Sequence, residues 1–423
     1  MTRHFSEIPR FKDVSQNEWD DWRWQLRNRL STLEDFEAIL NLDEKQRAYL
    51  QACMGKFRVS VTPYYASLMD PDDPGCPVRM QGVPTPAELV VRQEDLKDAV
   101  SEDFDSPTPR ITHRYPDRVL FVVTEMCSMY CRHCTRRRLV GGTEDIVAQE
   151  QIDNAIKYIE RAPEVRDVLI SGGDPLVLSD DTLEEIIARV RAIDHVEIIR
   201  IGSRVPVVCP QRITPELCAM LKKYHPLYLN THFNHPKEFT ADSKRACDML
   251  NDAGIPLGNQ SVLMRGINDC ANVMKRLCHK LVQYRVKPYY YYQCDLADGT
   301  AHFRTSVAKG IEIAESLRGH TTGFAVPVYI IDAIGGGGKT PVMPNYVISQ
   351  APGQVVLRNY EGVISKYTEP DDYVEPECHC EDCEADRKRL GVAGLFDSDT
   401  PTMQDVWAAR MQKVVDRKNR MKD

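Results

Sequence analysis

From Arg118 onward, the sequence alternates short β-branched runs with amphipathic segments of helical period. This alternation is typical of a parallel sheet whose strands are joined by crossover helices. The six runs predicted to be strands are 119–124, 168–171, 196–201, 227–231, 257–264 and 288–293. The segments predicted to be helices are 181–193, 214–224, 242–252, 272–285 and 306–317. Both a partial barrel and an open doubly wound sheet fit this pattern, and in both the reactive side chains lie just after strand ends.

Composition favours small-molecule chemistry. The chain has a formal charge of -8, and its lysines and arginines form no continuous basic stripe, which argues against a nucleic-acid partner. No segment has the apolar length needed to cross a bilayer, and the N-terminus lacks the apolar core of a signal peptide. We therefore expect no membrane association and a cytoplasmic location, where the 14 cysteines stay reduced and available to metals.

Three cysteines lie close together directly after the first predicted strand. Cys127, Cys131 and Cys134 form a C-x3-C-x2-C loop at the expected carboxyl edge of the sheet. Such thiolates hold iron-sulfur clusters, and three protein ligands leave one iron of a four-iron cluster open to another molecule. A zinc site or a redox pair is the alternative, although the loop lacks the fourth ligand of a closed zinc site.

This cysteine loop resembles the motif of the radical S-adenosylmethionine (radical SAM) superfamily. The resemblance implies a partial (β/α)6 barrel of the TIM type, a [4Fe-4S] cluster, and S-adenosylmethionine bound to the open iron. Ser171-Gly172-Gly173-Asp174 resembles the superfamily's Gly-Gly-Asp element and ends the second predicted strand, where we expect it to approach the methionyl amine. Gly-Gly-Asp alone is a common turn.

A lysine follows four consecutive glycines near the end of the alternating region. Gly335 to Gly338 precede Lys339, and the chain continues with Thr340 and Pro341. The spacing does not match a Walker A loop and no helix follows, which disfavours a nucleotide site. Glycines give the lysine freedom to reach a cofactor and swing away, which suits a Schiff base with pyridoxal phosphate.

With these motifs together, the chain resembles the lysine 2,3-aminomutase family from about residue 10 to beyond residue 395. The matching segments are 20–27, 112–118, 127–138, 230–236 and 335–350. The resemblance implies that Lys339 forms the Schiff base. It also implies that Arg114, Tyr115 and Arg118 contact the phosphate and ring of pyridoxal phosphate, a role that suits guanidinium groups. Surface salt bridges are the alternative role for these arginines.

Three further residues match the substrate contacts of this family. Arg136 is expected to bind the substrate α-carboxylate, since a bidentate arginine fixes both position and orientation. Asp295, after the sixth predicted strand, and Asp332, before the glycines, match the two acids that hold the distal ammonium of lysine. Either acid alone would more often be a solvated or capping residue. As a pair they would repel the distal carboxylate of glutamate.

Side chains at the ends of later predicted strands are candidates for contact with the adenosyl group of S-adenosylmethionine. These are His232 and Gln260, with Asn259 and Ser261 beside Gln260. A histidine or glutamine at a strand end is as often a structural hydrogen-bond partner, so both readings stay open.

A second group of cysteines lies in the polar C-terminal region. Cys378, Cys380 and Cys383 are one thiolate short of a tetrahedral zinc site. The family resemblance supplies Cys270 as the fourth ligand and a bond between subunits, so we expect a homodimer or homotetramer. His379 is a weaker candidate ligand, and a disordered tail with unbound thiols is the alternative. The expected divisions are a helical extension over 1–111, a barrel ending in the lysine over 112–340, and a zinc and oligomerisation segment over 341–423.

These expectations combine into one predicted reaction, the interconversion of L-lysine and L-β-lysine by migration of an amino group. The cluster needs an electron donor such as flavodoxin or ferredoxin. The alternatives within catalysis are the same chemistry on another amino acid such as glutamate, or on a lysine for translation-factor modification. The alternative outside catalysis is a scaffold that holds iron-sulfur and zinc. Lys339, Asp295 and Asp332 argue against it, because a scaffold needs neither a reactive lysine nor an ammonium pocket.

Overall fold

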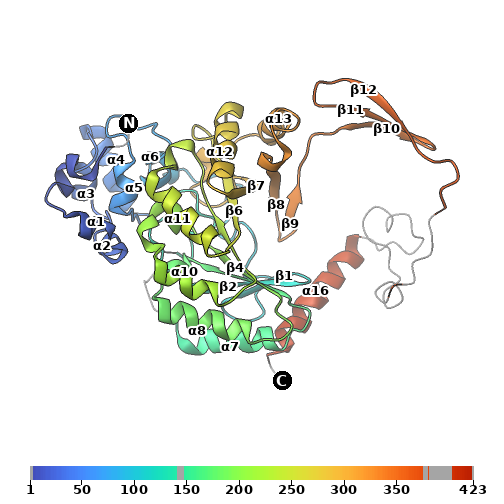
Figure 1. Ribbon diagram of the computed structural model, residues 1–423, viewed down its shortest axis with the longest axis horizontal. Helices are drawn as coiled ribbons and strands as arrows, with labels where there is room; N and C mark the ends of the chain where they lie inside the picture. Colours follow the sequence, from blue (N-terminus) through green and yellow to red (C-terminus); the bar gives the residue numbers. More distant parts are fainter. Residues whose placement is uncertain (1–2, 141–146, 375–379, 381–402, 422–423) are drawn as a thin grey trace. The chain divides into compact units, whose positions relative to one another are not determined.

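The computed structural model describes residues 3–140, 147–374, 380 and 403–421 (Figure 1). The chain divides into two compact units, Met1–Pro344 and Asn345–Asp423, and each is described by itself. The first unit contains the alternating region, so the cysteine loop and Lys339 both belong to it.

The first unit is built on a nine-stranded sheet in which the strands follow one another in chain order (Figure 1). Strands β2 to β8 form one parallel series. Strands β1 and β9 pair antiparallel with its two edges. The bounds are β1 Ile111–Tyr115, β2 Arg118–Thr124, β3 Asp167–Gly172, β4 Ile198–Gly202, β5 Leu227–Thr231, β6 Leu257–Leu263, β7 Val286–Gln293, β8 Val328–Ala333 and β9 Gly338–Pro341.

Helices connect the parallel strands and bury one apolar stripe each. In the helix between β3 and β4, Leu183, Ile187 and Val190 form this stripe at helical spacing. Thr214 caps the next long helix by accepting a hydrogen bond from the backbone N–H of Leu217 at 3.2 Å. The bounds are α7 Gln149–Glu160, α8 Asp180–Arg191, α9 Val205–Val208, α10 Pro215–Lys222, α11 Ala241–Asp252, α12 Ala271–Gln283 and α13 Val307–Leu317.

The predicted partial barrel is confirmed. Strands β2 to β7 coincide with the six predicted strands, and α8 and α10 to α13 coincide with the predicted helices, with ends that differ by at most two residues. The prediction did not include β1, α7, β8 or β9. Strand β8 is a seventh parallel strand that leads into glycines instead of a helix, so the strand-helix alternation does not mark it.

Residues before β1 fold as short helices with an aromatic core. The rings of Phe5 and Trp19 stack with centroids 4.3 Å apart, and Phe11 lies 5.5 Å from Trp19. This segment is joined to the barrel, because the backbone N–H of Leu96 donates to the carbonyl of Leu296 at 2.7 Å. The helices are η1 Phe5–Glu7, η2 Pro9–Phe11, α1 Gln16–Asp20, α2 Trp22–Arg27, α3 Leu33–Glu37, α4 Glu44–Met54, α5 Pro63–Ser67, α6 Arg79–Gly82 and η3 Pro86–Leu89.

The second unit contains a three-stranded antiparallel sheet and one long helix. The strands are β10 Val347–Ala351, β11 Gln354–Arg358 and β12 Ile364–Thr368, with β11 in the middle. The helix is α16, Met403–Asn419. Over the part of the chain that the structure describes, no helix combines the length and apolar character needed to cross a bilayer.

Candidate active site

The three cysteines of the loop lie just past β2, at the carboxyl edge of the parallel strands, and all three are partly buried. Burial raises the pKa of the Cys127 thiol well above its ordinary value, and the charge of Asp174 adds to this effect. Burial also raises the pKa of Cys134 to about 11. These two groups are therefore protonated thiols at neutral pH, and a bound metal would convert them into thiolates.

The three cysteines are compatible with a multi-iron cluster. Within the described ranges, no three side chains of His, Cys, Asp or Glu converge as ligands of one metal ion. A four-iron cluster does not require such convergence, because each thiolate binds a different iron. The guanidinium of Arg204 donates to the sulfur of Cys131 at 2.8 Å, and hydrogen bonds to ligand sulfurs are one of the features that tune such clusters.

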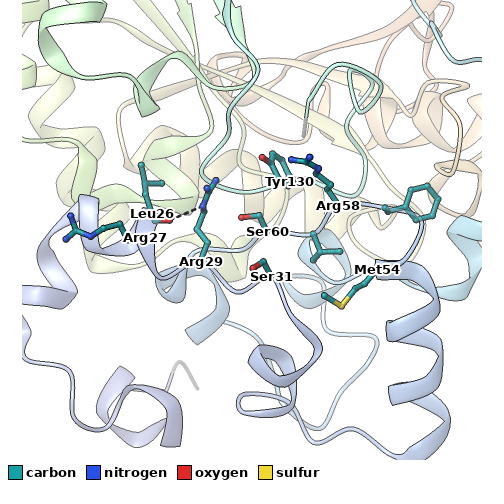
Figure 2. A pocket seen from close by; sticks show the side chains of 10 residues that line it. Leu26, Arg27, Arg29, Ser31, Met54, Arg58, Ser60 and Tyr130 are labelled. Atoms are coloured by element: carbon teal, nitrogen blue, oxygen red, sulfur yellow. Dashed lines mark hydrogen bonds between the residues drawn. The ribbon is translucent and has the colours of Figure 1, made fainter. Parts of the chain in front are cut away.

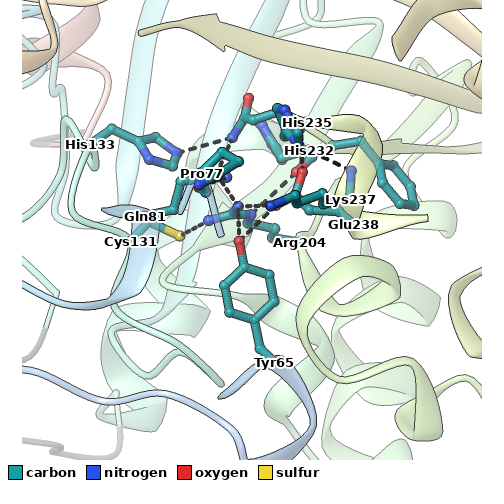
Figure 3. Close-up of polar contacts among 12 residues, drawn as sticks. Tyr65, Pro77, Gln81, Cys131, His133, Arg204, His232, His235, Lys237 and Glu238 are labelled. Atoms are coloured by element: carbon teal, nitrogen blue, oxygen red, sulfur yellow. Dashed lines mark hydrogen bonds and ion pairs between the residues drawn. The ribbon is translucent and has the colours of Figure 1, made fainter. Parts of the chain in front are cut away.

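Arg204 is the centre of a buried polar network beside the loop (Figure 3). Its Nη2 donates to Oε1 of Glu238 at 2.8 Å and to Oε1 of Gln81 at 2.5 Å. The hydroxyl of Tyr65 donates to the same oxygen of Glu238 at 2.7 Å. Burial alone would lower the pKa of Arg204, but Cys131, Tyr65 and Glu238 raise it above its ordinary value. Arg204 is therefore a fixed positive charge next to a cysteine.

The two glycines at the end of β3, Gly172 and Gly173, pack directly on backbone at the start of the cysteine loop. A Cβ on Gly172 would lie 2.2 Å from the carbonyl oxygen of Thr124, and one on Gly173 would lie 2.1 Å from that of Met126. Gly172 also has a φ of +142°, which other residues rarely adopt. Close backbone approach between neighbouring loops therefore requires both glycines, whatever else they contact.

Asp174 and Ser171 complete the predicted Gly-Gly-Asp element. The carboxylate of Asp174 accepts a hydrogen bond from the hydroxyl of Ser203 at 2.7 Å and from the backbone N–H of Arg204 at 2.8 Å. Burial raises the pKa of Asp174 to about 6. Ser171 is buried next to Gly202 on the neighbouring strand. The element thus ties the end of β3 to the end of β4.

Glu88, in η3, forms ion pairs with two arginines in and just after the cysteine loop. Its buried carboxylate pairs with Arg132 at 2.5 Å and with Arg137 at 2.8 Å. Burial alone would raise the pKa of Glu88, but the hydrogen bonds and charges of these two arginines lower it below its ordinary value. The carboxylate is therefore ionised and shared between two cations of the loop.

Glu88→Ala is expected to destabilise the protein by about 3–5 kcal/mol, because it leaves the buried guanidinium of Arg132 and the partly buried one of Arg137 without their shared acid. Denaturant unfolding of the variant and the parent protein measures this difference. Glu88→Gln keeps the shape and some hydrogen bonds, so its loss of stability should be smaller. Equal stability of Glu88→Ala and the parent would show that the ion pairs contribute nothing.

Lys339 lies on the edge strand β9, directly opposite Asp332 on β8. Its Nζ is 3.5 Å from Oδ1 of Asp332 and 5.2 Å from the centre of the Tyr292 ring. Its backbone N–H donates to the hydroxyl of Tyr115 at 2.9 Å, and a Cβ on Gly338 would lie 3.1 Å from that hydroxyl. The chain turns back at the glycines, and this turn brings the exposed amine of Lys339 next to the carboxylate of Asp332.

Asp295 follows β7 and belongs to the same group. Burial, and then the charge of Asp332, raise the pKa of Asp295 to about 7, while Lys339 and Arg304 oppose this shift. The two predicted acids are therefore close enough to repel one another. A cation bound between Asp295 and Asp332 would relieve this repulsion and favour the ionised form of both carboxylates.

Arg136, after the cysteine loop, faces the same region. Its Nε and Nη2 donate to both oxygens of Glu102, with the shortest distance at 2.7 Å. Burial opposes the charge, but Glu102 and then other groups, including Asp332, raise the pKa of Arg136. None of the described residues accepts a hydrogen bond from its Nη1 in the structure. One edge of the guanidinium is therefore fixed by the protein, and the other can bind a carboxylate.

The three predicted pyridoxal phosphate contacts fall into two groups. The guanidinium of Arg118 lies 3.8 Å above the ring of Tyr115, whose hydroxyl accepts the hydrogen bond from the backbone N–H of Lys339, so both are close to the backbone of Lys339. Arg114 instead pairs with Asp105 at 2.6 Å. An exposed amine, an aromatic ring and an arginine are a donor set that fits an aldehyde cofactor with a phosphate.

Of the strand-end candidates, His232 has one ring nitrogen in a hydrogen bond to the backbone. Its Nδ1 donates to the carbonyl of Gln260 at 2.8 Å, which leaves Nε2 as an acceptor. Burial and the charge of Arg204 lower the pKa of His232 to about 4, so the ring is neutral. Asn259 and Ser261 both hydrogen-bond the carbonyl of Phe233, at 3.0 and 2.9 Å, and so join β6 to the end of β5.

The predicted zinc ligands are described only in part. Cys270 is exposed at the N-cap of α12, and Cys380 is also exposed. Cys378, His379 and Cys383 lie outside the described residues. The zinc site stays a prediction.

Sequence reasoning missed three residues of this region. Arg204 follows β4 by two residues, so the strand-end rule would have found it. Glu102 and Glu88 lie in the N-terminal segment, and only the folded chain brings them to Arg136 and Arg132. No sequence signal marks them.

Comparisons with known proteins agree with this arrangement. Residues 121–277 match the radical SAM superfamily, and residues 314–423 match the family described as lysine-2,3-aminomutase. The chain is 58% identical to an L-lysine 2,3-aminomutase of Clostridium subterminale over 96% of this chain and 98% of that protein. It is 52% identical to one of Bacillus subtilis (93% and 85%). It is 47% identical to a glutamate 2,3-aminomutase of Clostridioides difficile, over 83% of each chain.

Identity above one half extends over 96% and 93% of this chain in two of these relatives, a share large enough to include both the cysteine loop and the lysine after the glycines. On this evidence the chain belongs to the lysine 2,3-aminomutase family, the isomerases of the radical SAM superfamily that its sequence motifs resemble.

Proposed function

We propose that this chain interconverts L-lysine and L-β-lysine by moving an amino group between neighbouring carbons. The observation that carries the proposal is one group of side chains, Lys339, Asp295, Asp332 and Arg136, whose charges influence one another. An amino acid with a cationic end fits this group, because Arg136 suits its carboxylate and the two acids suit its distal ammonium. The names of relatives that are 52% to 58% identical support the same substrate.

Three cofactors belong to the proposal. Cys127, Cys131 and Cys134 would hold a [4Fe-4S] cluster, and Lys339 would hold pyridoxal phosphate with Arg118 near its phosphate. Contacts to S-adenosylmethionine would come from residues 171–174, His232 and Gln260. With these groups bound, the cluster and S-adenosylmethionine supply a carbon-centred radical and pyridoxal phosphate carries the migrating nitrogen.

The protein's own residues hold the substrate at both ends and leave its middle free. Glu102 keeps Arg136 in one orientation, so the substrate carboxylate meets a guanidinium that is already positioned. Lys339 must leave when the substrate amine takes its place. Gly335 and Gly336 have φ values of +72° and +75°, and a Cβ on Gly335 would meet nothing within 4 Å, so the chain has room to move at Gly335.

The affinity for lysine is expected to fall as the pH drops through about 7. Binding of an ammonium requires the ionised form of Asp295, and its pKa in the substrate-free protein is raised to about 7. Below this pH a proton occupies the acid, and kcat/KM should decline by about tenfold per unit. A pH profile of kcat/KM between about 5.5 and 8.5 measures this limb. In Asp295→Asn the residual kcat/KM should not show this decline at low pH. If the decline were unchanged in the variant, another group would be responsible for it.

The direct test of the proposal is product identification. Protein reconstituted without oxygen is incubated with a chemical reductant, S-adenosylmethionine, pyridoxal phosphate and L-lysine, and the products are separated and compared with L-β-lysine. The same assay with L-glutamate tests the runner-up substrate. If lysine is returned unchanged under conditions in which the cluster and both cofactors are bound, the proposed function is wrong.

Glutamate is the second candidate because a glutamate 2,3-aminomutase is 47% identical to this chain. Its distal carboxylate would meet Asp295 and Asp332, and like charges placed together cost several kcal/mol. We therefore favour lysine. A zinc site built on Cys270, Cys378, Cys380 and Cys383, assembly into a homodimer or homotetramer, and a cytoplasmic location remain parts of the proposal that rest on sequence.

A further inference from the structure

An arginine-lined pocket of about 430 Å³ lies on the N-terminal segment, behind the cysteine loop (Figure 2). Its walls come from α2 and the residues after it, from the end of α4 and the residues after it, and from the loop itself. The ten lining residues are Leu26, Arg27, Arg29, Ser31, Met54, Phe57, Arg58, Val59, Ser60 and Tyr130.

Three hydrogen bonds connect this pocket to the cysteine loop. The guanidinium of Arg29 donates to the carbonyl of Cys127 at 2.6 Å. The backbone N–H of Tyr130 donates to the carbonyl of Ser60 at 2.9 Å, and Arg132 donates to the carbonyl of Arg58 at the same distance. Tyr130, between Cys127 and Cys131, lines the pocket itself. A molecule bound in the pocket would therefore contact Tyr130 of the cysteine loop and the residues that hold this loop in place.

The pocket is positively charged on a chain whose net charge is -8. Its lining contains three arginines and no acid. Arg27 pairs with Asp21 at 3.4 Å, but both side chains are largely exposed and such a surface pair holds its cation weakly. Arg58 is exposed, and among the described residues no acid pairs with it. The charges of Arg27 and Arg58 are thus accessible to a partner.

Apolar side chains lie among these arginines. Leu26, Met54 and Phe57 are all partly exposed in the pocket lining. A mixture of aromatic, methionine and arginine side chains is typical of the centre of a protein interface. A site for a small anion would need no exposed apolar side chains, so the lining favours a protein partner.

We propose that this pocket is the docking site of a small acidic electron-carrier protein. The inference rests on the proposed function, in which the cluster must be reduced before the reaction begins. The carrier gives up one electron and the cluster gains one, and no bond is made or broken in this transfer. Acidic side chains around the carrier's redox group would meet Arg27 and Arg58, which places that group beside the cysteine loop.

Arg58→Glu tests this proposal, with reduced flavodoxin as the carrier. The rate of cluster reduction is followed anaerobically by electron paramagnetic resonance, at low and at high salt. At low salt the variant should be reduced about tenfold or more slowly than the parent, and salt should slow the parent but not the variant. Lysine turnover driven by excess dithionite should be unchanged, because a chemical reductant does not dock. Arg27→Glu should repeat the effect.

Lys222→Glu is the matched control, because it makes the same charge change on an exposed residue of α10 outside the pocket. It should be reduced at the parental rate. The proposal would be overturned if reduced flavodoxin reduced the cluster at equal rates in Arg58→Glu, Arg27→Glu and the parent at low salt. It would also be overturned if inorganic phosphate bound in the pocket without changing those rates. Absence of lysine turnover with dithionite in the parent would instead count against the proposed function.

Discussion

Lys339→Ala is expected to abolish lysine turnover, by roughly 10³-fold or more, since it removes the amine proposed to form and release the bond to pyridoxal phosphate. The visible absorption of bound pyridoxal phosphate should be lost, while the absorption of the cluster stays. The side chain of Lys339 is exposed on an edge strand and does not contribute to the core, so the fold should be retained. Absorption spectra and turnover of the purified variant measure both effects.

Lys339→Arg is the control that separates covalent bonding from charge. It keeps a cation opposite Asp332 but cannot form the bond to the cofactor, so it should be as inactive as the alanine variant. Retention of both the pyridoxal absorption and the activity in either variant would show that another lysine carries the cofactor.

Asp295→Asn is expected to have two opposite effects. The kcat/KM for lysine should fall by roughly 30- to 5,000-fold, because an ammonium loses one of two buried partners at a cost of about 2–5 kcal/mol. The substrate-free protein should become more stable at neutral pH by about 1 kcal/mol or more, since the raised pKa of Asp295 means that its ionised form is unfavourable there. Steady-state kinetics and thermal unfolding measure the two effects.

The sign of the stability effect follows from the direction of the pKa shift. The folded protein holds a proton on Asp295 up to about pH 7, whereas the ordinary value is 3.8. The stability of the parent should therefore decline as the pH rises between these values, and the variant should lack this decline. Asp194→Asn makes the same change on an exposed residue and should alter neither quantity. If Asp295→Asn were less stable than the parent, the contacts of the ionised acid would stabilise the folded protein by more than its burial costs.

The strands, their order and the cysteine loop were predictable, because they depend on local patterns. Runs such as 227–231 and 257–264 alternate with helices, and in a parallel sheet that alternation places Cys127 and Asp174 at one edge. Asp332 and Lys339 lie opposite each other because the chain turns back at the glycines and β9 pairs antiparallel with β8. The alternation of strands and helices in the sequence does not predict this turn.

The partners of the arginines were not predictable for a different reason. Glu102 reaches Arg136, and Glu88 reaches Arg132, across separations of 34 and 44 residues. Pairings of this kind depend on how the N-terminal segment packs on the barrel, and any of the many acids in that segment would satisfy the sequence equally well. The same holds for the pocket behind the cysteine loop, whose lining comes from three separate segments.

The glycines at the carboxyl ends of β3 and β8 have opposite mechanical consequences. Where Gly172 and Gly173 lie, backbone touches backbone, so the turn after β3 and the cysteine loop form one stiff body. Around Gly335 there is empty space, so the ribbon leading to Lys339 is compliant. Movement of the chain around Gly335 would therefore leave the backbone of the cysteine loop in place. Substitutions should be tolerated least at Gly172 and Gly173, where the backbone is most closely packed.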